Sequence, residues 1–127
     1  MKTIKDLKNI TIEQFVSLLF EARDISHNYH LKSKSYSEHI ALNEFYSKIL
    51  ELTDEFVETY QGQYGIINIT NEEKSDINLP INYLMSFVDK IRKYNFSLDV
   101  KDSHLKNIID EMTALTYKTL YKLKNLK

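Results

Sequence analysis

The chain has 127 residues, of which 43% are hydrophobic, and its formal net charge is −1. These values fit one globular domain, residues 1–127, that is large enough to bury its own core. They exclude a disulfide framework, because the chain has no Cys, and they do not favour DNA coating, which needs many Lys and Arg contacts to phosphate.

The first periodic segment predicts a helix over residues 11–31. Thr11 and Gln14 form a T-x-x-Q pattern that can cap free main-chain amides at the start of this helix. Phe20, Val16 and His27 lie along one edge of its apolar face. At about 100° per residue, that face is made of Ile12, Phe15, Leu18, Leu19, Ala22, Ile25 and Tyr29.

A polar turn over residues 32–35 separates this helix from a second one. Ser35 or Ser37 can cap the second helix, which we expect to run to about Gln61 and to stop at Gly62 and Gly65. So short a turn makes the two helices antiparallel neighbours. The apolar stripe of the second helix is made of Leu42, Phe45, Tyr46, Ile49, Leu52, Thr53, Phe56 and Tyr60.

The next segment, residues 63–79, is irregular and long. A connection of this length can travel the whole length of a bundle, so the second and third helices can be parallel. It can also contain a short helix or strand. Pro80 then suits the first turn of a helix that we expect to end near Tyr94.

Residues 95–99 turn the chain into a fourth helix, which we expect to end near Lys124. Its inward positions are Leu105, Ile108, Ile109, Met112, Leu115, Thr119 and Leu123, and those of the third helix are Ile81, Leu84, Met85, Val88 and Ile91. Short, long and short connections predict an all-α protein, a ferritin-like four-helix bundle with a long crossover between helices two and three.

Four side chains in the first two helices suggest a metal site. His27, His39, Asp54 and Glu58 are separated by 12, 15 and 4 residues (39−27, 54−39, 58−54). Imidazole together with carboxylate suits a cation such as Fe(II). The alternative interpretation is that these are ordinary solvated residues of amphipathic helices.

The segment HNYHLKSKSYSEHIALNEFYSKILELTDEFVE, residues 27–58, resembles the starvation-induced DNA-protecting miniferritins of the Dps type. The resemblance implies that His27 and His39 of one subunit face the Asp54 and Glu58 side chains of a twofold partner. Iron would then bind between subunits, and the protein could be a ferroxidase that oxidises Fe(II). His30, in the phrase YHL, matches the first ligand better if neighbouring residues are aligned, so His27 and His30 both stay candidates.

The phrases SYSEH, FY and YQGQYG also look like a phage-encoded ferritin-like family whose function is not established. The chain lacks the Trp and the loop Gly that accompany the first miniferritin ligand, which favours a second hypothesis. In that hypothesis the protein is a noncatalytic oligomeric interaction protein or a virion-associated protein. Both hypotheses predict a homo-oligomer, at least a dimer, in the cytoplasm of the host or in a virion.

Neither hypothesis predicts a membrane partner, because no apolar run reaches the roughly 20 residues that a spanning helix needs. DNA protection is a third possibility, which rests on the miniferritin resemblance and the C-terminal lysines. The near-neutral charge makes it the weakest of the three. No Gly-rich phosphate loop, nucleophile triad or CxxC pair offers another chemistry.

Overall fold

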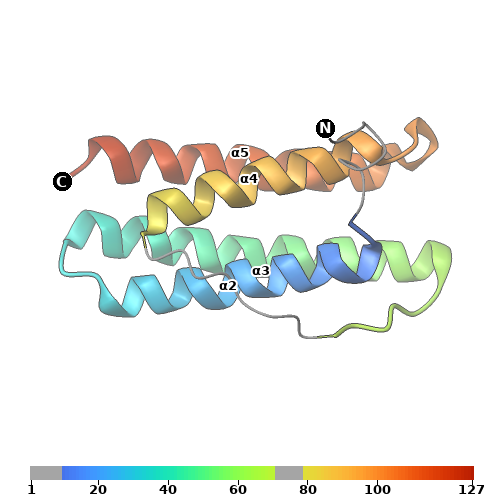
Figure 1. Ribbon diagram of the computed structural model, residues 1–127, viewed down its shortest axis with the longest axis horizontal. Helices are drawn as coiled ribbons and strands as arrows, with labels where there is room; N and C mark the ends of the chain where they lie inside the picture. Colours follow the sequence, from blue (N-terminus) through green and yellow to red (C-terminus); the bar gives the residue numbers. More distant parts are fainter. Residues whose placement is uncertain (1–9, 71–78) are drawn as a thin grey trace, which may run out of the picture.

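The structure is a computed structural model that describes residues 10–70 and 79–127 (Figure 1). Within these residues the chain forms four long α-helices, one short 3-10 helix and no strand, which confirms the all-α prediction. The elements are α2 (Ile12–Lys32), α3 (Tyr36–Tyr64), α4 (Pro80–Ser97), η1 (Val100–Asp102) and α5 (Ser103–Asn125).

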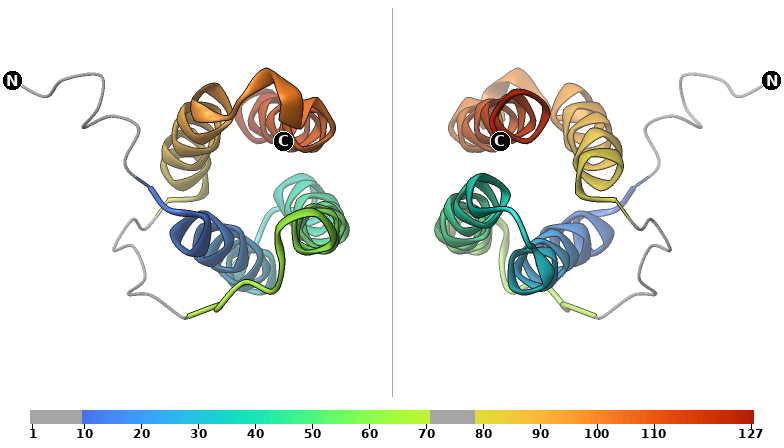
Figure 2. Two further views of the ribbon diagram at one scale, coloured as in Figure 1. Left: turned by 90° about the vertical axis from the view of Figure 1, so that its right-hand side faces the viewer. Right: turned by 90° about the vertical axis from the view of Figure 1, so that its left-hand side faces the viewer.

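The helices run side by side with directions that follow from the lengths of their connections. Helix α3 returns antiparallel to α2, α4 runs parallel to α3, and α5 returns antiparallel to α4 (Figure 1). Seen end-on, the four helices stand at the corners of a square, with α2 and α5 each between α3 and α4 (Figure 2). The parallel directions of α3 and α4 agree with the predicted long crossover between them. Membership of the ferritin-like superfamily stays a prediction.

Local sequence signals set the helix starts. The Thr11 hydroxyl accepts a hydrogen bond from the Gln14 main-chain N–H at 3.1 Å, and the Gln14 side chain accepts one from Thr11 at 2.9 Å. This capping box is the predicted one. Ser35 is the N-cap of α3, where its hydroxyl accepts a hydrogen bond from the Glu38 N–H.

Helix α3 ends later than predicted, because Gly62 lies inside it. Gly65 ends the helix with a φ of 101°, a conformation that glycine adopts without the strain of a side chain. A glycine within a helix costs only about 1 kcal/mol relative to alanine. The extra turn gains contacts, since the Tyr64 hydroxyl donates to Asp102 at 2.6 Å.

Helix α4 differs from the prediction at its end and in its inward face. It continues to Ser97, whose hydroxyl donates to the Tyr94 carbonyl at 2.6 Å. Met85, expected to point inward, is half exposed. The buried face is rotated toward the aromatic residues and consists of Tyr83, Leu84, Phe87, Val88, Ile91 and Tyr94.

Aromatic rings dominate the core. Phe15 of α2 stacks on Tyr94 of α4 at 4.0 Å between ring centroids and meets Phe56 of α3 edge-on at 5.1 Å. Val16, predicted at the edge of α2, is fully buried. These contacts join three helices at one level, and edge-on and offset rings add stabilisation beyond the apolar area that they bury.

The connection after α3 is described as far as residue 70, and residues 65–70 form neither helix nor strand. Ile67 is buried there, and its N–H donates to the Gln61 side chain at 3.0 Å. The remainder of the predicted connection, residues 71–78, lies outside the described residues. In the described ranges, none of the helices is both long and apolar enough to cross a lipid bilayer.

Candidate functional site at the first helix hairpin

Two of the predicted ligands, His30 and His39, meet where α2 turns into α3. The Nδ1 atom of His30 lies 2.8 Å from the main-chain carbonyl oxygen of His39, and the Nδ1 atom of His39 lies 2.9 Å from that of His30. The two rings stack at 3.7 Å between centroids with planes 25° apart. The pair is therefore reciprocal and closes the hairpin.

The partners of these rings assign their tautomer. A carbonyl oxygen only accepts hydrogen bonds, so each Nδ1 carries a proton and donates it. The Nε2 atoms are left as the ring nitrogens with a lone pair, as in histidines that bind metals. However, a metal ion lies in the plane of the ring that binds it, and stacked rings have separate planes. One ion cannot bind both rings of one chain in this arrangement.

His27 occupies a different level of the hairpin. It is exposed and stacks on Tyr46 of α3 at 4.3 Å, while its ring centroid lies 6.1 Å from that of His30. Tyr46 also meets the His30 ring edge-on at 5.3 Å, and of these two histidines it is His30 that stacks on His39. Of the two candidates for the first ligand, His30 is thus the one beside His39 in the same chain.

Asp54 and Glu58 are both exposed on α3, one helical turn apart. They follow His39 by 15 and 19 residues, which places them about 22 and 28 Å farther along α3. In one chain these carboxylates cannot share an ion with His39. Over the described ranges, no group of three or more His, Asp or Glu side chains could hold a metal ion. The predicted contact between two subunits is a separate arrangement and stays a prediction.

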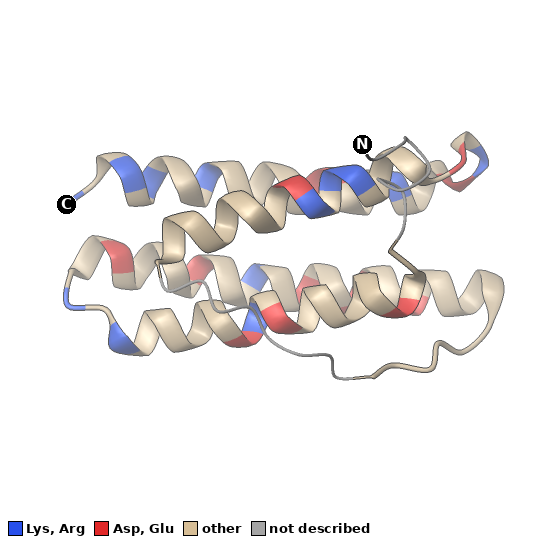
Figure 3. Cartoon of the chain, viewed as in Figure 1, with Lys and Arg blue, Asp and Glu red and all other residues tan. Residues whose placement is uncertain are grey.

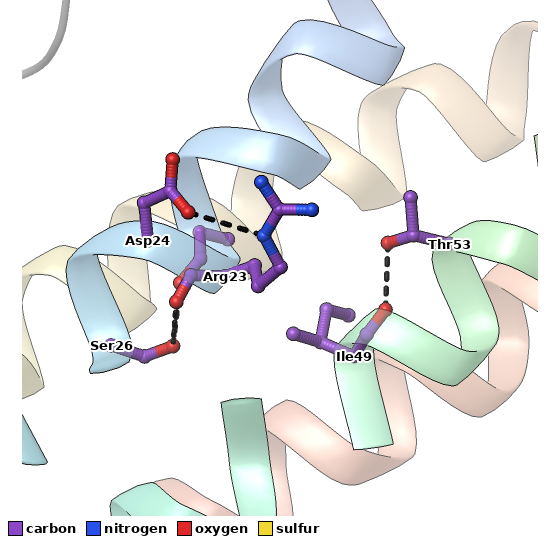
Figure 4. A network of polar contacts seen from close by, with 6 residues as sticks. Arg23, Asp24, Ser26, Ile49 and Thr53 are labelled. Carbon is purple, nitrogen blue, oxygen red and sulfur yellow. Dashed lines mark hydrogen bonds and ion pairs between the residues drawn. The ribbon is translucent and has the colours of Figure 1, made fainter. Parts of the chain in front are cut away.

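Asp24, His27 and His30 lie at successive i, i+3 positions of α2, a spacing that brings side chains of one helix close together. Asp24 instead pairs with Arg23, with 3.1 Å between the carboxylate and Nε (Figure 4). The same view shows the hydroxyls of Ser26 and Thr53 turned back onto carbonyls of their own helices. These groups are satisfied locally, so none of them points into a shared polar site.

A second polar cluster, which the sequence analysis missed, lies at the other end of α3. The Asp102 carboxylate accepts hydrogen bonds from the Gln63 amide at 2.9 Å and the Tyr64 hydroxyl at 2.6 Å. The hydrogen bond from Tyr64 lowers the pKa of Asp102 and, from the other side, raises the pKa of Tyr64 to about 12. Nε2 of His104 lies 2.6 Å from the Gln63 amide oxygen. The cluster ties the end of α3 to the start of α5.

No local sequence signal could have revealed this cluster, because its partners are separated by 38 to 41 residues. His104 itself is exposed. With Tyr64 and Gln63 on one helix and Asp102 before another, the arrangement fixes two helix ends.

Comparison with known proteins places the chain in a family. Residues 30–123 match DUF5856, a family of unknown function. The chain belongs to the DUF5856 family. The DUF5856 match includes His30, His39, Asp54 and Glu58 and begins after His27.

One relative of this DUF5856 chain is an uncharacterized 14.6 kDa protein from the mobD-ri intergenic region of Enterobacteria phage T4. The two are 27% identical over 112 residues, which cover 87% of this chain and 86% of the phage protein. The resemblance to a phage-encoded family of unknown function is thereby confirmed. No solved structure matches the chain, and membership of the ferritin-like superfamily is not shown.

Proposed function

We propose that this protein is a noncatalytic interaction protein that works as a homo-oligomer in a phage context, in the host cytoplasm or in the virion. Two findings support this proposal. The histidines nearest to the expected iron site hold the α2–α3 hairpin together. The relative in phage T4 supports the phage context.

The observation that carries the proposal is a groove between α3 and α5. Its volume is about 560 Å³, and Ala114 and Leu115 supply apolar surface. Charged side chains of opposite sign line its two halves. The half near the start of α3 holds Glu44, Lys48, Lys118 and Lys122 (net charge +2), the other half holds Glu111, and Glu51 lies at the boundary between them, paired with Lys48.

A groove with opposite charges in its two halves is complementary to a reversed copy of itself. Homodimers most often use such a self-complementary surface around a twofold axis. Figure 3 shows Lys and Arg positions, in blue, along the C-terminal part of α5. Complementary potentials speed encounter and fix the register of a protein contact. Self-association is therefore the activity that this surface fits best.

The test of the proposal is the solution mass of the full chain together with its metal content. We expect an assembly larger than the 15.1 kDa protomer, and we expect it to form without bound iron. A protein that stays monomeric up to about 1 mM would contradict the proposal, because a weaker contact stabilises a pair by less than about 4 kcal/mol. An assembly that dissociates when iron is chelated would contradict the noncatalytic part.

A second candidate function is iron binding between subunits, with oxidation of Fe(II). It is supported by the free Nε2 atoms of His30 and His39 and by the exposed carboxylates Asp54 and Glu58. These groups do not fit an iron ion within one chain, so this function needs a partner that presents its carboxylates to the histidine pair. That contact would use the α2–α3 side of the bundle, not the groove between α3 and α5.

Anaerobic titration with Fe(II), followed by admission of oxygen, separates the two candidates. The iron hypothesis predicts ferric absorbance that is lost in the Asp54→Asn, Glu58→Gln double variant. The interaction hypothesis predicts no saturable binding in either protein. The control is Glu55→Gln, which removes an exposed carboxylate on the same helix.

A further inference from the structure

We propose that two copies of this chain pair face to face through α3 and α5, around a twofold axis that crosses these helices at right angles. In this pair α5 runs antiparallel to the partner's α5, and Glu111 of each copy lies opposite Lys118 of the other. The inference rests on the proposed homo-oligomeric function and specifies its surface, its axis and its ion pairs.

The level of each charge along the groove follows from one contact. Lys122 of α5 makes an ion pair with Glu44 of α3, which fixes where the two helices face each other. Because α3 and α5 are antiparallel, four residues onward in α3 and four residues backward in α5 reach the same level. Lys48 and Lys118 therefore lie at one level, about 6 Å from the ion pair.

The acidic half of the groove lies farther along the same direction. Glu111 precedes Lys122 by 11 residues, so it lies about 16 Å from the ion pair along the helix axis. Glu51 lies between these levels and pairs with Lys48 at 3.3 Å. Neither Glu111 nor Lys118 forms an ion pair with another described residue, so one charge in each half has no counterion from its own described chain.

These charges select one of two possible twofold axes. An axis parallel to the helices would place α5 of one copy on α3 of the other at the same level, and Lys118 would face the partner's Lys48. Like charges brought together in this way oppose binding. An axis perpendicular to the helices reverses the copy along the groove, so the basic half of each protomer meets the acidic half of the other.

The centre of the pair is suited to close packing. The midpoint between Glu111 and Lys118 falls between Ala114 and Leu115. Ala114 is exposed, and its small side chain allows two helices to approach closely, while Leu115 adds apolar area at the centre. Glu51 of α3 lies at nearly the same level, about 10 Å from the ion pair, and its contact with Lys48 of its own chain offsets its charge there.

The experiment uses two charge reversals in the full chain, Lys118→Glu and Glu111→Lys. Each variant alone places like charges opposite each other twice per dimer, so we expect self-association to weaken by roughly tenfold or more in Kd. Mixing the two variants joins an all-acidic edge with an all-basic edge. We therefore expect the mixture to form a heterodimer at least as tight as the wild-type dimer.

Lys124→Glu is the matched control, because Lys124 lies on the same helix but lines the groove between α4 and α5. It should leave the dimer unchanged. Sedimentation velocity measures all four proteins and the mixture. A wild-type protein that is monomeric would overturn the proposed function together with this inference.

The inference alone fails if the wild-type protein associates but neither reversal weakens association, or if the mixture does not restore it. Circular dichroism of each variant checks that it is folded. Because Glu111 and Lys118 are exposed, we expect both substitutions to leave the helix content unchanged. A loss of association that is equal in Lys124→Glu would also overturn the inference, because it would show a response to net charge and not to this face.

Discussion

His30 and His39 each donate an imidazole Nδ1–H to the main-chain carbonyl of the other, at 2.8 and 2.9 Å, across a turn that joins α2 to α3. These two residues, which stay predicted ligands of a site between subunits, therefore join the two helices of the hairpin. The His30 carbonyl is among the last carbonyls of α2, which lack partners within the helix, and it accepts from the His39 ring as well as from the Ser33 N–H.

Because the His30–His39 pair joins α2 to α3, we expect the loss of either ring to lower the stability of the protein. His39→Ala removes one hydrogen bond and the ring stacking, and it leaves the carbonyl of His30 only its longer, 3.4 Å hydrogen bond from the Ser33 N–H. We expect the free energy of unfolding to fall by about 1 to 3 kcal/mol, measured by urea denaturation. His27→Ala, at an exposed position, is the control and should cost less. Equal urea-denaturation midpoints for wild type and His39→Ala would show that the His30–His39 pair adds no stability.

The aromatic core makes a larger prediction. Phe15→Ala should lower the free energy of unfolding by about 3 to 5 kcal/mol, because it opens a cavity beside Tyr94 and Phe56 in a fully buried site. Phe96→Ala is matched in chemistry but lies at a position that is 82% exposed. Its effect should stay within about 0.5 kcal/mol. A comparable loss in both variants would contradict the packing described for α2, α3 and α4.

Tyr64 predicts a change at alkaline pH. The hydrogen bond to Asp102 raises the pKa of Tyr64 to about 12 from the ordinary 10.0. Since the folded pKa is the higher one, the stabilising contribution is complete below pH 10 and is lost as the pH rises toward 12. Ultraviolet titration of wild type minus Tyr64→Phe should show one phenol that ionises late. A difference curve centred near pH 10 would refute this hydrogen bond.

Asp102 predicts the matching change in acid. The hydrogen bond from Tyr64, aided by Gln63, lowers the pKa of Asp102 below the ordinary 3.8. A lowered folded pKa stabilises the protein above the unfolded value, and this contribution is lost as the pH falls through the folded value. Urea denaturation at a series of pH values should give Asp102→Asn a shallower loss of stability below pH 3.8 than wild type. An identical slope would contradict the assignment.

Much of the fold was predictable because its signals are local. Thr11 and Ser35 begin helices as their cap patterns predict, and Gly65 ends α3 with the expected glycine conformation. The end of α3 was placed too early because Gly62 has a weak local preference that tertiary contacts of Tyr64 outweigh. The buried face of α4 was set by aromatic packing against Phe15, which apolar spacing along one helix does not encode.

The candidate site was less predictable, because its geometry depends on long-range contacts. Residue type and interval made His27, His39, Asp54 and Glu58 look like a set, yet the interval cannot show that the His30 and His39 rings stack. Nor does any short pattern indicate that Asp102 meets Tyr64. The order of the charged residues along the groove depends on how α3 and α5 face each other, which only the ion pair between Glu44 and Lys122 shows.

The most direct test of the central claim, that this protein acts by associating with itself, is sedimentation velocity of the purified full chain with and without an iron chelator. The account predicts a species of twice the 15.1 kDa protomer mass or a multiple of it, unchanged by the chelator. A single monomeric species at every concentration, or an assembly that exists only with iron bound, would contradict it.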